Sequence, residues 1–174
     1  MQKTILVDAQ KCTGCRTCEL VCSVKNEGMA NPSRARLTVV KFEDILLEIP
    51  MLCQQCSTAP CMAICPAKAI SRDDASGIVS VNYDLCIGCK MCVVVCPFGA
   101  MKFDPVSRKV AKCEQCGGDP TCVKFCETKA LQYVDVAAVN LKKAREGARR
   151  LSEIIQKTAR EPVAAEQGSN RNQG

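Results

Sequence analysis

Sixteen cysteines constrain this chain of 174 residues more than any other feature. They fall into four blocks of four, and every block opens with the spacing C-x2-C and closes with C-x3-C. The blocks are Cys12-Cys15-Cys18-Cys22, Cys53-Cys56-Cys61-Cys65, Cys86-Cys89-Cys92-Cys96 and Cys113-Cys116-Cys122-Cys126. Thiolates are metal ligands, and no cysteine is left over. The pattern therefore predicts four sites with four sulfur ligands each.

The third block continues into Pro97 and completes the run C-x2-C-x2-C-x3-C-P. This run binds clusters in bacterial ferredoxins, so we predict that the sixteen cysteines ligate four [4Fe-4S] clusters. Four zinc sites are the alternative, but zinc sites usually separate two C-x2-C pairs by a longer stretch. The N-terminal sequence shows no signal-peptide pattern, so we expect a cytoplasmic location, where disulfides are disfavoured.

Composition excludes several classes of function. Histidine and tryptophan are absent, and aromatic residues make up only 3% of the chain. Without histidine there is no histidine-based acid–base catalysis, no Rieske ligation and no haem held by histidine. No phosphate-binding loop or dinucleotide fingerprint is present, and no stretch is apolar and long enough to predict a membrane span. Because large apolar side chains are few, we expect the fold to depend on its clusters.

The formal charge of +6 suggests a nucleic-acid-binding protein at first sight. Four oxidised clusters with their thiolates would add about −8, which leaves the loaded protein near −2. The lysines and arginines are then expected to balance the clusters. Basic residues interleaved with aromatic ones are also missing, so we predict no nucleic-acid partner.

The second and third blocks with their connection form the clearest unit. A short helix or turn (67–70), a polar turn (71–77) and a strand (78–81) are predicted between them. Other strands are predicted at 5–7, 37–42, 45–49 and 131–134, with a hairpin from 101 to 111. The half-repeat recurs around the first and fourth blocks, which predicts an α+β fold made of a duplicated, nested two-cluster ferredoxin. Its outer half would be 1–52 with 97–135, and its inner half 53–96.

Cysteines stop after the last predicted strand, and the pattern becomes helical. A helix is expected over 136–160, followed by a flexible polar tail over 161–174. One stripe of the helix is apolar and consists of Leu141, Ala144, Ala148, Leu151 and Ile155. This stripe would pack on the rest of the chain or dock on a partner protein.

In two-cluster ferredoxins the fourth cysteine of each run ligates the other cluster. The ferredoxin-like connection pairs the second block with the third, and the first then pairs with the fourth by elimination. The predicted ligand sets are Cys53, Cys56, Cys61 and Cys96; Cys65, Cys86, Cys89 and Cys92; Cys12, Cys15, Cys18 and Cys126; and Cys22, Cys113, Cys116 and Cys122. The alternative pairs the first block with the second and the third with the fourth.

The four-block plan resembles the four-cluster iron–sulfur subunits of the DMSO reductase and formate dehydrogenase type over residues 3–134. That family shows the nested ligation given above. Residues 18–44 are similar to the small electron-transfer subunits that accompany carbon monoxide dehydrogenase, certain hydrogenases and tungsten-dependent aldehyde oxidoreductases. The last of these groups is the preferred match.

The resemblance implies a non-catalytic subunit that relays single electrons along four [4Fe-4S] clusters. One partner would be a catalytic subunit with tungsten, molybdenum or nickel. The other would be a flavoprotein subunit, a ferredoxin or a further copy of the chain. A freestanding polyferredoxin is the alternative function. An enzyme with an open iron site is disfavoured because all cysteines match in fours. Apolar residues beside the ligands, such as Ile87, Val93 and Val94, are expected to shield the clusters from water.

Overall fold

The structure is a computed structural model that describes residues 2–160, without the side chains of several residues in the last helix. The predicted tail over 161–174 lies outside the described residues. The chain divides into two units, Met1–Val136 and Ala137–Gly174, and we describe each by itself. All sixteen cysteines belong to the first unit, so this unit holds every candidate site.

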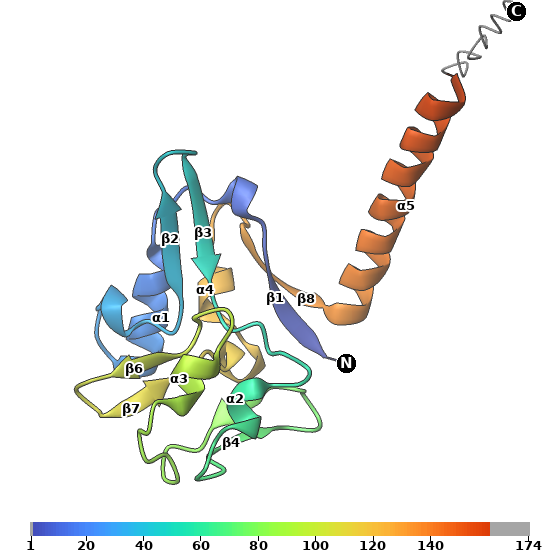
Figure 1. Ribbon diagram of the computed structural model, residues 1–174. Helices are drawn as coiled ribbons and strands as arrows, with labels where there is room; N and C mark the ends of the chain where they lie inside the picture. Colours follow the sequence, from blue (N-terminus) through green and yellow to red (C-terminus); the bar gives the residue numbers. More distant parts are fainter. Residues whose placement is uncertain (1, 161–174) are drawn as a thin grey trace, which may run out of the picture. The chain divides into compact units, whose positions relative to one another are not determined.

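Four antiparallel two-stranded sheets organise the first unit (Figure 1). Each sheet pairs a strand that follows one cysteine block with a strand that precedes a block. The pairs are β2 (Thr38–Phe42) with β3 (Leu47–Met51), β4 (Ile70–Arg72) with β5 (Val79–Val81), β6 (Lys102–Asp104) with β7 (Lys109–Ala111), and β1 (Lys3–Val7) with β8 (Leu131–Asp135). The last pair joins the two ends of the unit, because β1 precedes the first block and β8 follows the fourth.

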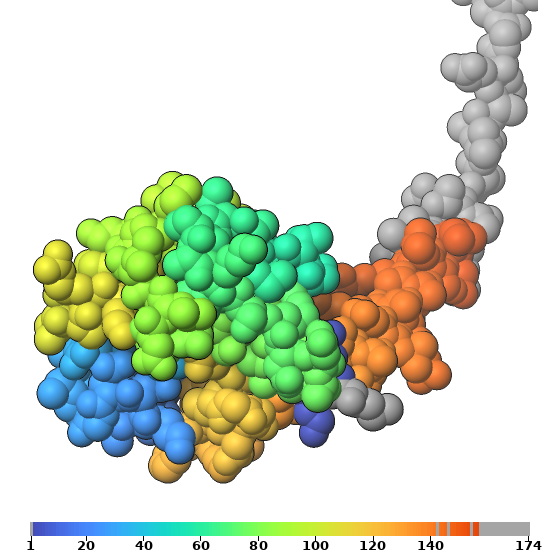
Figure 2. Space-filling model, turned by 90° about the horizontal axis from the view of Figure 1, so that it is seen from below, coloured from blue at the N-terminus to red at the C-terminus, as the bar shows by residue number. Residues whose placement is uncertain are grey.

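Helices carry the third cysteine of every block. They are α1 (Thr17–Glu27), α2 (Pro60–Ala63), α3 (Met91–Val95) and α4 (Thr121–Lys124). Helix α1 contacts α4, and α2 contacts α3. In Figure 2 the blue segment that includes α1 lies beside the golden segment that includes α4. The helices of the first and fourth blocks therefore meet, as do those of the second and third.

Two small cores lie inside the unit. The first is built from Leu37, Val39, Leu52, Leu131 and Ile5, together with cysteines of the first and fourth blocks. The second is built from Ile70, Val79, Val81, Met101 and Val110, with cysteines of the second and third blocks packed against or within it. Because the unit has few large apolar residues, cysteine side chains form a substantial part of both cores.

Most predicted strands are confirmed, including β1, β2, β8 and the hairpin of β6 and β7. Two details of the prediction were wrong. Strand β4 begins at Ile70, which was expected to end a short helix or turn, and includes Ser71 and Arg72, which were expected in a polar turn; that turn spans only 74–76. The strand expected at 45–49 begins later, at Leu47, and runs to Met51.

The β6–β7 hairpin was expected in the outer half, but Met101 and Val110 pack in the second core. The division into outer and inner halves remains a prediction.

Helix α5 (Val136–Arg160) occupies the stretch for which a helix was expected. Its residues Leu141, Leu151 and Ile155 are exposed. Within residues 2–160, no helix combines the length and apolarity that crossing a bilayer requires.

Candidate metal centres

Three cavities are each lined by four cysteines drawn from two blocks. In every case three cysteines of one block come with a single cysteine from the paired block. The sets are Cys53, Cys56, Cys61 and Cys96; Cys22, Cys113, Cys116 and Cys122; and Cys65, Cys86, Cys89 and Cys92. These three groups of four cysteines are identical to three of the predicted ligand sets. Those sets follow from pairing the second block with the third and the first with the fourth.

The remaining cysteines are those of the fourth predicted set. Cys12, Cys18 and Cys126 pack in one core. Cys12 and Cys15 both contribute to raising the pKa of the Cys18 thiol, after the larger effect of its burial. Because such charge effects act over short distances, these observations place the three cysteines of the first block around one location.

The backbone curls in the same way in all four blocks. The residue before the second cysteine has a positive φ each time: 66° at Gly14, 51° at Gln55, 68° at Gly88 and 52° at Gln115. Left-handed backbone reverses the local direction of the chain. The C-x2-C spacing can therefore wrap around one location in every block, which is the local geometry that a bound cluster requires.

Backbone amides point at the fourth cysteine of three blocks. The amide of Arg36 donates to Sγ of Cys22 at 3.3 Å, that of Ala69 to Cys65 at 3.3 Å, and that of Leu131 to Cys126 at 3.4 Å. Hydrogen bonds to sulfur favour the charged thiolate form, and they are one of the factors that set cluster potentials. The atoms available as metal ligands are sulfur in every set, so the residues present fit an iron–sulfur cluster.

Burial changes the acidity of the thiols. It raises the pKa of Cys18 and of Cys113 to about 12 and that of Cys92 to about 11. Cys15 is exposed, and hydrogen bonds from Thr17 lower the pKa of its thiol. In the metal-free chain the buried thiols would be protonated at neutral pH, so cluster binding must release their protons.

Charge effects between thiols connect the four predicted ligand sets in one order. The sets that begin with Cys12, Cys22, Cys53 and Cys65 are called the first, second, third and fourth sites. Cys18 raises the pKa of Cys122, which links the first site to the second. Cys53 raises that of Cys113, which links the second to the third. Cys61 raises that of Cys92, which links the third to the fourth. These are minor contributions beside burial, and they are consistent with sites that neighbour one another in this order.

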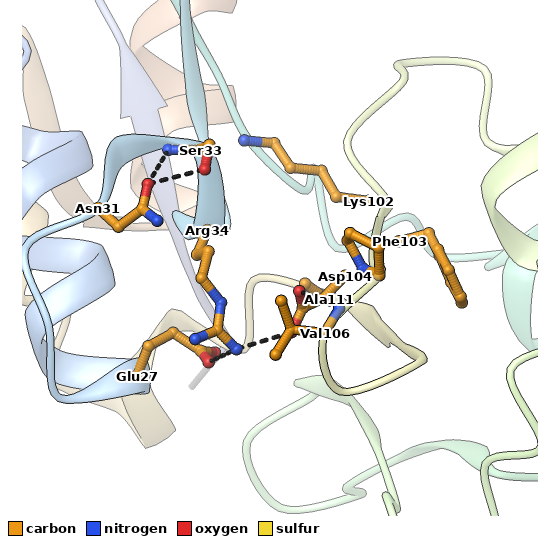
Figure 3. A pocket seen from close by; sticks show the side chains of 10 residues that line it. Glu27, Asn31, Ser33, Arg34, Lys102, Phe103, Asp104, Val106 and Ala111 are labelled. Atoms are coloured by element: carbon orange, nitrogen blue, oxygen red, sulfur yellow. Dashed lines mark hydrogen bonds and ion pairs between the residues drawn. The ribbon is translucent and has the colours of Figure 1, made fainter.

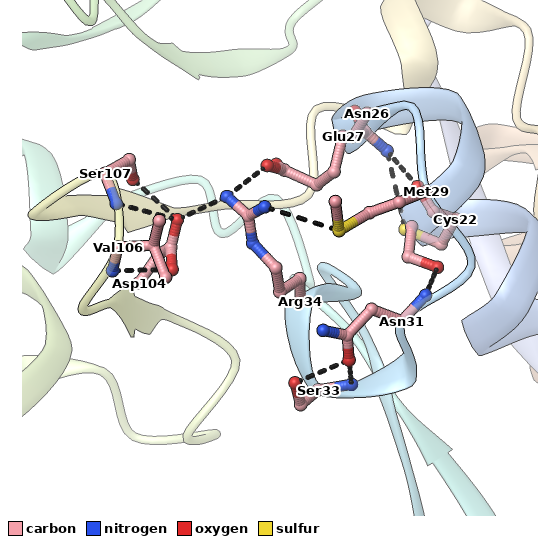
Figure 4. A network of polar contacts seen from close by, with 11 residues as sticks. Cys22, Asn26, Glu27, Met29, Asn31, Ser33, Arg34, Asp104, Val106 and Ser107 are labelled. Atoms are coloured by element: carbon pink, nitrogen blue, oxygen red, sulfur yellow. Dashed lines mark hydrogen bonds and ion pairs between the residues drawn. The ribbon is translucent and has the colours of Figure 1, made fainter.

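A larger cavity, of about 300 Å³, has no cysteine in its wall (Figure 3). Arg34 lies at this cavity and joins two carboxylates, Glu27 at 2.8 Å and Asp104 at 2.7 Å (Figure 4). Hydrogen bonds from Ser107 and from Arg34 hold the pKa of Asp104 well below its usual range. This network links the end of α1 to the β6–β7 hairpin. Sequence reasoning missed it because its residues lie far apart in the chain.

The expected apolar cover over the ligands is incomplete. Ile87 is 69% exposed and Val94 is 86% exposed, whereas Val93 packs against the second core. Ile87 nevertheless lines the cavity of Cys65, Cys86, Cys89 and Cys92, so it covers this site while remaining largely exposed. The prediction of a shielding role was wrong for Val94, which is a surface residue.

Fold and sites together define an iron–sulfur protein with ferredoxin-like domains of helices and small sheets. Two family models match: "4Fe-4S dicluster domain" over residues 45–136 and "4Fe-4S binding domain" over residues 9–25. The chain belongs to the 4Fe-4S dicluster domain family. Its sixteen cysteines fit four [4Fe-4S] clusters, as predicted.

Curated relatives cover most of the chain. YsaA of Escherichia coli K12 is 40% identical over 84% of this chain and 98% of its own length. Electron transport protein HydN of the same strain is 39% identical over 78% of this chain and 89% of its own length. The polyferredoxin-like subunit of aliphatic sulfonate oxidoreductase from Pyrococcus furiosus is 40% identical over 70% of both chains. The chain is thus an electron-transfer iron–sulfur protein related to subunits of oxidoreductases.

Proposed function

We propose that this chain is the electron-transfer subunit of an oxidoreductase complex and relays single electrons along a row of four [4Fe-4S] clusters. The observation that carries this proposal is the set of three cavities, each lined by four cysteines from paired blocks. Bound clusters of this type each take up and release one electron. The row of neighbouring sites supports a path from one end of the first unit to the other.

The proposed ligands are the four predicted sets. Cys12, Cys15, Cys18 and Cys126 form one end of the row, and Cys65, Cys86, Cys89 and Cys92 form the other. Contacts of α1 with α4 and of α2 with α3 support this nested pairing over the alternative of neighbouring blocks. The positive φ of the residue before the second cysteine of each block supports a repeated half-ferredoxin.

Exposure supports electron entry and exit at the two ends. Cys15 and Cys89 are the exposed cysteines of the chain, and they belong to the two end sites. The two central sites have no exposed cysteine. A partner protein that approaches an end site would therefore come closer to a cluster than one that approaches the middle.

The proposed catalytic partner is a tungsten aldehyde oxidoreductase in the cytoplasm. The similarity of residues 18–44 to companions of such enzymes supports it. The relative from an aliphatic sulfonate oxidoreductase supports a partner of the oxidoreductase class. Carbon monoxide dehydrogenase, hydrogenase and formate dehydrogenase partners are the alternatives. The proposed acceptor is a ferredoxin or a flavoprotein subunit.

Isolation of the native complex tests this proposal. The chain would be purified from its own source under anaerobic conditions, and its co-purifying subunits would be identified and assayed for tungsten, molybdenum and nickel. We expect a stoichiometric catalytic subunit that contains tungsten. Another of the three metals would replace the proposed partner, and a lone chain of 18.8 kDa with all its iron would favour the freestanding polyferredoxin.

A further inference from the structure

Lys112 is the largest fully buried side chain of the described residues, with 0% of its surface exposed. Lysine is almost never fully buried unless its charge is paired. This residue follows strand β7 and directly precedes Cys113, the first cysteine of the fourth block. A buried charge at this position needs a physical reason.

Lys112 joins the two cores. Its Nζ donates to the carbonyl oxygen of Val79 at 2.5 Å and to that of Cys113 at 3.2 Å. The buried side chain of Gln55 makes a parallel link, because its Nε2 donates to the Cys113 carbonyl at 2.9 Å and its Oε1 accepts from the Val79 amide at 2.8 Å. Val79 belongs to the second core and Cys113 to the first. Both polar side chains therefore sit where the central sites of the row meet.

No carboxylate neutralises this ammonium group. Within residues 2–160, Lys112 takes part in none of the ion pairs, and both of its acceptors are neutral carbonyls. A buried and unpaired charge is unfavourable unless a counter-charge lies close by. Sulfur ligands can supply this counter-charge, because Lys112 lines the cavity of Cys53, Cys56, Cys61 and Cys96. Its charge also helps to lower the pKa of Cys61 and of Cys113, against the larger effect of burial.

We propose that Lys112 sets the reduction potentials of the two central clusters by supplying their buried counter-charge. The proposal rests on the proposed ligand sets, in which Cys53, Cys56, Cys61 and Cys96 hold one central cluster and Cys22, Cys113, Cys116 and Cys122 hold the other. Each reduction adds one negative charge to a site that is already negative. A buried positive charge favours this step, and the low dielectric of the interior strengthens the effect.

The two central sites gain most because Lys112 lies at their junction. The end sites lie one position further along the row, so the same charge acts on them more weakly. Reduction of one central cluster makes reduction of its neighbour less favourable, because the added negative charges repel each other. The positive charge of Lys112 opposes this effect and raises the reduction potentials of both central clusters. Its loss would make the centre of the row a barrier to electrons that pass between the ends.

Lys112→Met tests the proposal, because it removes the charge and keeps a long side chain. The full chain with four clusters would be titrated with a reductant and followed by EPR, with Cys→Ser variants used to assign signals to sites. We expect at least a tenfold loss in the equilibrium constant for reduction of the central clusters, ~59 mV for a one-electron couple. The end clusters should shift less.

Lys109→Met is the matched control. Lys109 is the first residue of strand β7, which Lys112 directly follows, and its Nζ donates to the carbonyl oxygen of Tyr83 at 2.5 Å. It lines none of the three cysteine cavities. We expect unchanged potentials for all four clusters in this variant, which would separate the effect of a buried charge at the junction from the loss of a lysine–carbonyl contact.

Gln55→Glu covers the case in which Lys112→Met does not fold. This variant keeps Lys112 and places a negative charge beside it, so the central potentials should again fall. The proposal would be overturned if a variant kept all four clusters and the potentials of the two central clusters did not change. If such a variant were only less stable, the role of Lys112 would be structural. An error in the proposed ligand sets would be recognised separately. In that case a Cys→Ser variant would change the EPR signal of a cluster other than the one its set predicts.

Discussion

Cysteines from opposite ends of the first unit are expected to serve one cluster. Cys12 and Cys126 pack in the same core, although they belong to the first and last blocks. We predict that Cys126→Ser and Cys12→Ser each abolish or alter the same EPR signal, since serine is a poorer ligand for iron. Cys86→Ser should alter a different signal. A signal shared by Cys126→Ser and Cys86→Ser would contradict the nested pairing.

Arg34 is expected to stabilise the link between α1 and the β6–β7 hairpin. Arg34→Met removes its ion pairs with Glu27 and Asp104 and should lower the melting temperature. Low pH should also lower the melting temperature. The pKa of Asp104 is depressed in the folded protein, so its stabilising effect is present above the ordinary aspartate pKa and is lost as the pH falls through the depressed value.

Lys41→Met is the control for Arg34. The pair of Lys41 with Glu43 is largely solvent-exposed, with side-chain exposures of 49% and 82%, and such pairs contribute little. Melting curves by circular dichroism would compare both variants with the parent chain. An equal loss in the two variants would show that the Arg34 network has no special role.

The three groups of cysteines that line cavities were predictable from the sequence, whereas the roles of Lys112 and Arg34 were not. Ligand spacing within a block is local, because a cluster needs several sulfurs from one short loop. The importance of Lys112 depends on its hydrogen bond to Val79 and on the parallel link from Gln55 to Cys113, and both Val79 and Gln55 come from other segments. A single sequence contains no pattern that brings those segments together.

The backbone conformation of the third cysteine block requires glycine at position 88. Its φ is +68°, and an added Cβ would meet the carbonyl oxygen of Arg108 at 2.4 Å. Gly88→Ala is therefore expected to destabilise the protein by more than ~1 kcal/mol, since both the backbone and a neighbouring main-chain atom oppose it. Thermal loss of the cluster absorbance would measure the effect.

Gly99→Ala separates the two causes. Gly99 also has a positive φ, +58°, but nothing lies within 4 Å of an added Cβ. This variant should show only the cost of the backbone conformation and a smaller loss of stability. If Gly99→Ala were as harmful as Gly88→Ala, the contact with Arg108 would be irrelevant.

Strands were easier to predict than helices in this chain. Runs of apolar residues predicted β1, β2 and β8. Strand β4 was not predicted, because two of its three residues, Ser71 and Arg72, are polar. Arg72 uses its guanidinium to bind the carbonyl of Gly77, so a polar residue is satisfied inside this short sheet. Helix α1 begins within a cysteine block, where ligand spacing hides the helical period.

Iron removal is expected to unfold the first unit as a whole. Four of the ten buried residues in the first core are cysteines, so the clusters occupy the place of ordinary apolar packing. Treatment with a chelator under oxidising conditions should abolish most strand and helix signal of circular dichroism, and iron with sulfide should restore it. Retention of native β-structure without iron would show that the apolar residues alone suffice.

The proposed nested topology was one of the two pairings that the sequence allowed. Spacing indicated four sites, but their arrangement depends on which blocks meet in space. Contacts of α1 with α4, together with the pairing of β1 with β8, favour one arrangement. Long-range pairings of this kind leave no local trace in a sequence, because they are decided by the packing of the complete unit.

The pairing of β1 with β8 also affects how the protein is made. Strand β1 leaves the ribosome first, but its partner is complete only at Asp135. At about 5–20 residues per second, β1 waits on the order of ten seconds for β8. The cysteines from 53 to 96 have all emerged by then, so the middle of the chain can mature before its ends. With the proposed ligand sets, the two clusters held by cysteines 53–96 can therefore form before the two that need cysteines of the fourth block.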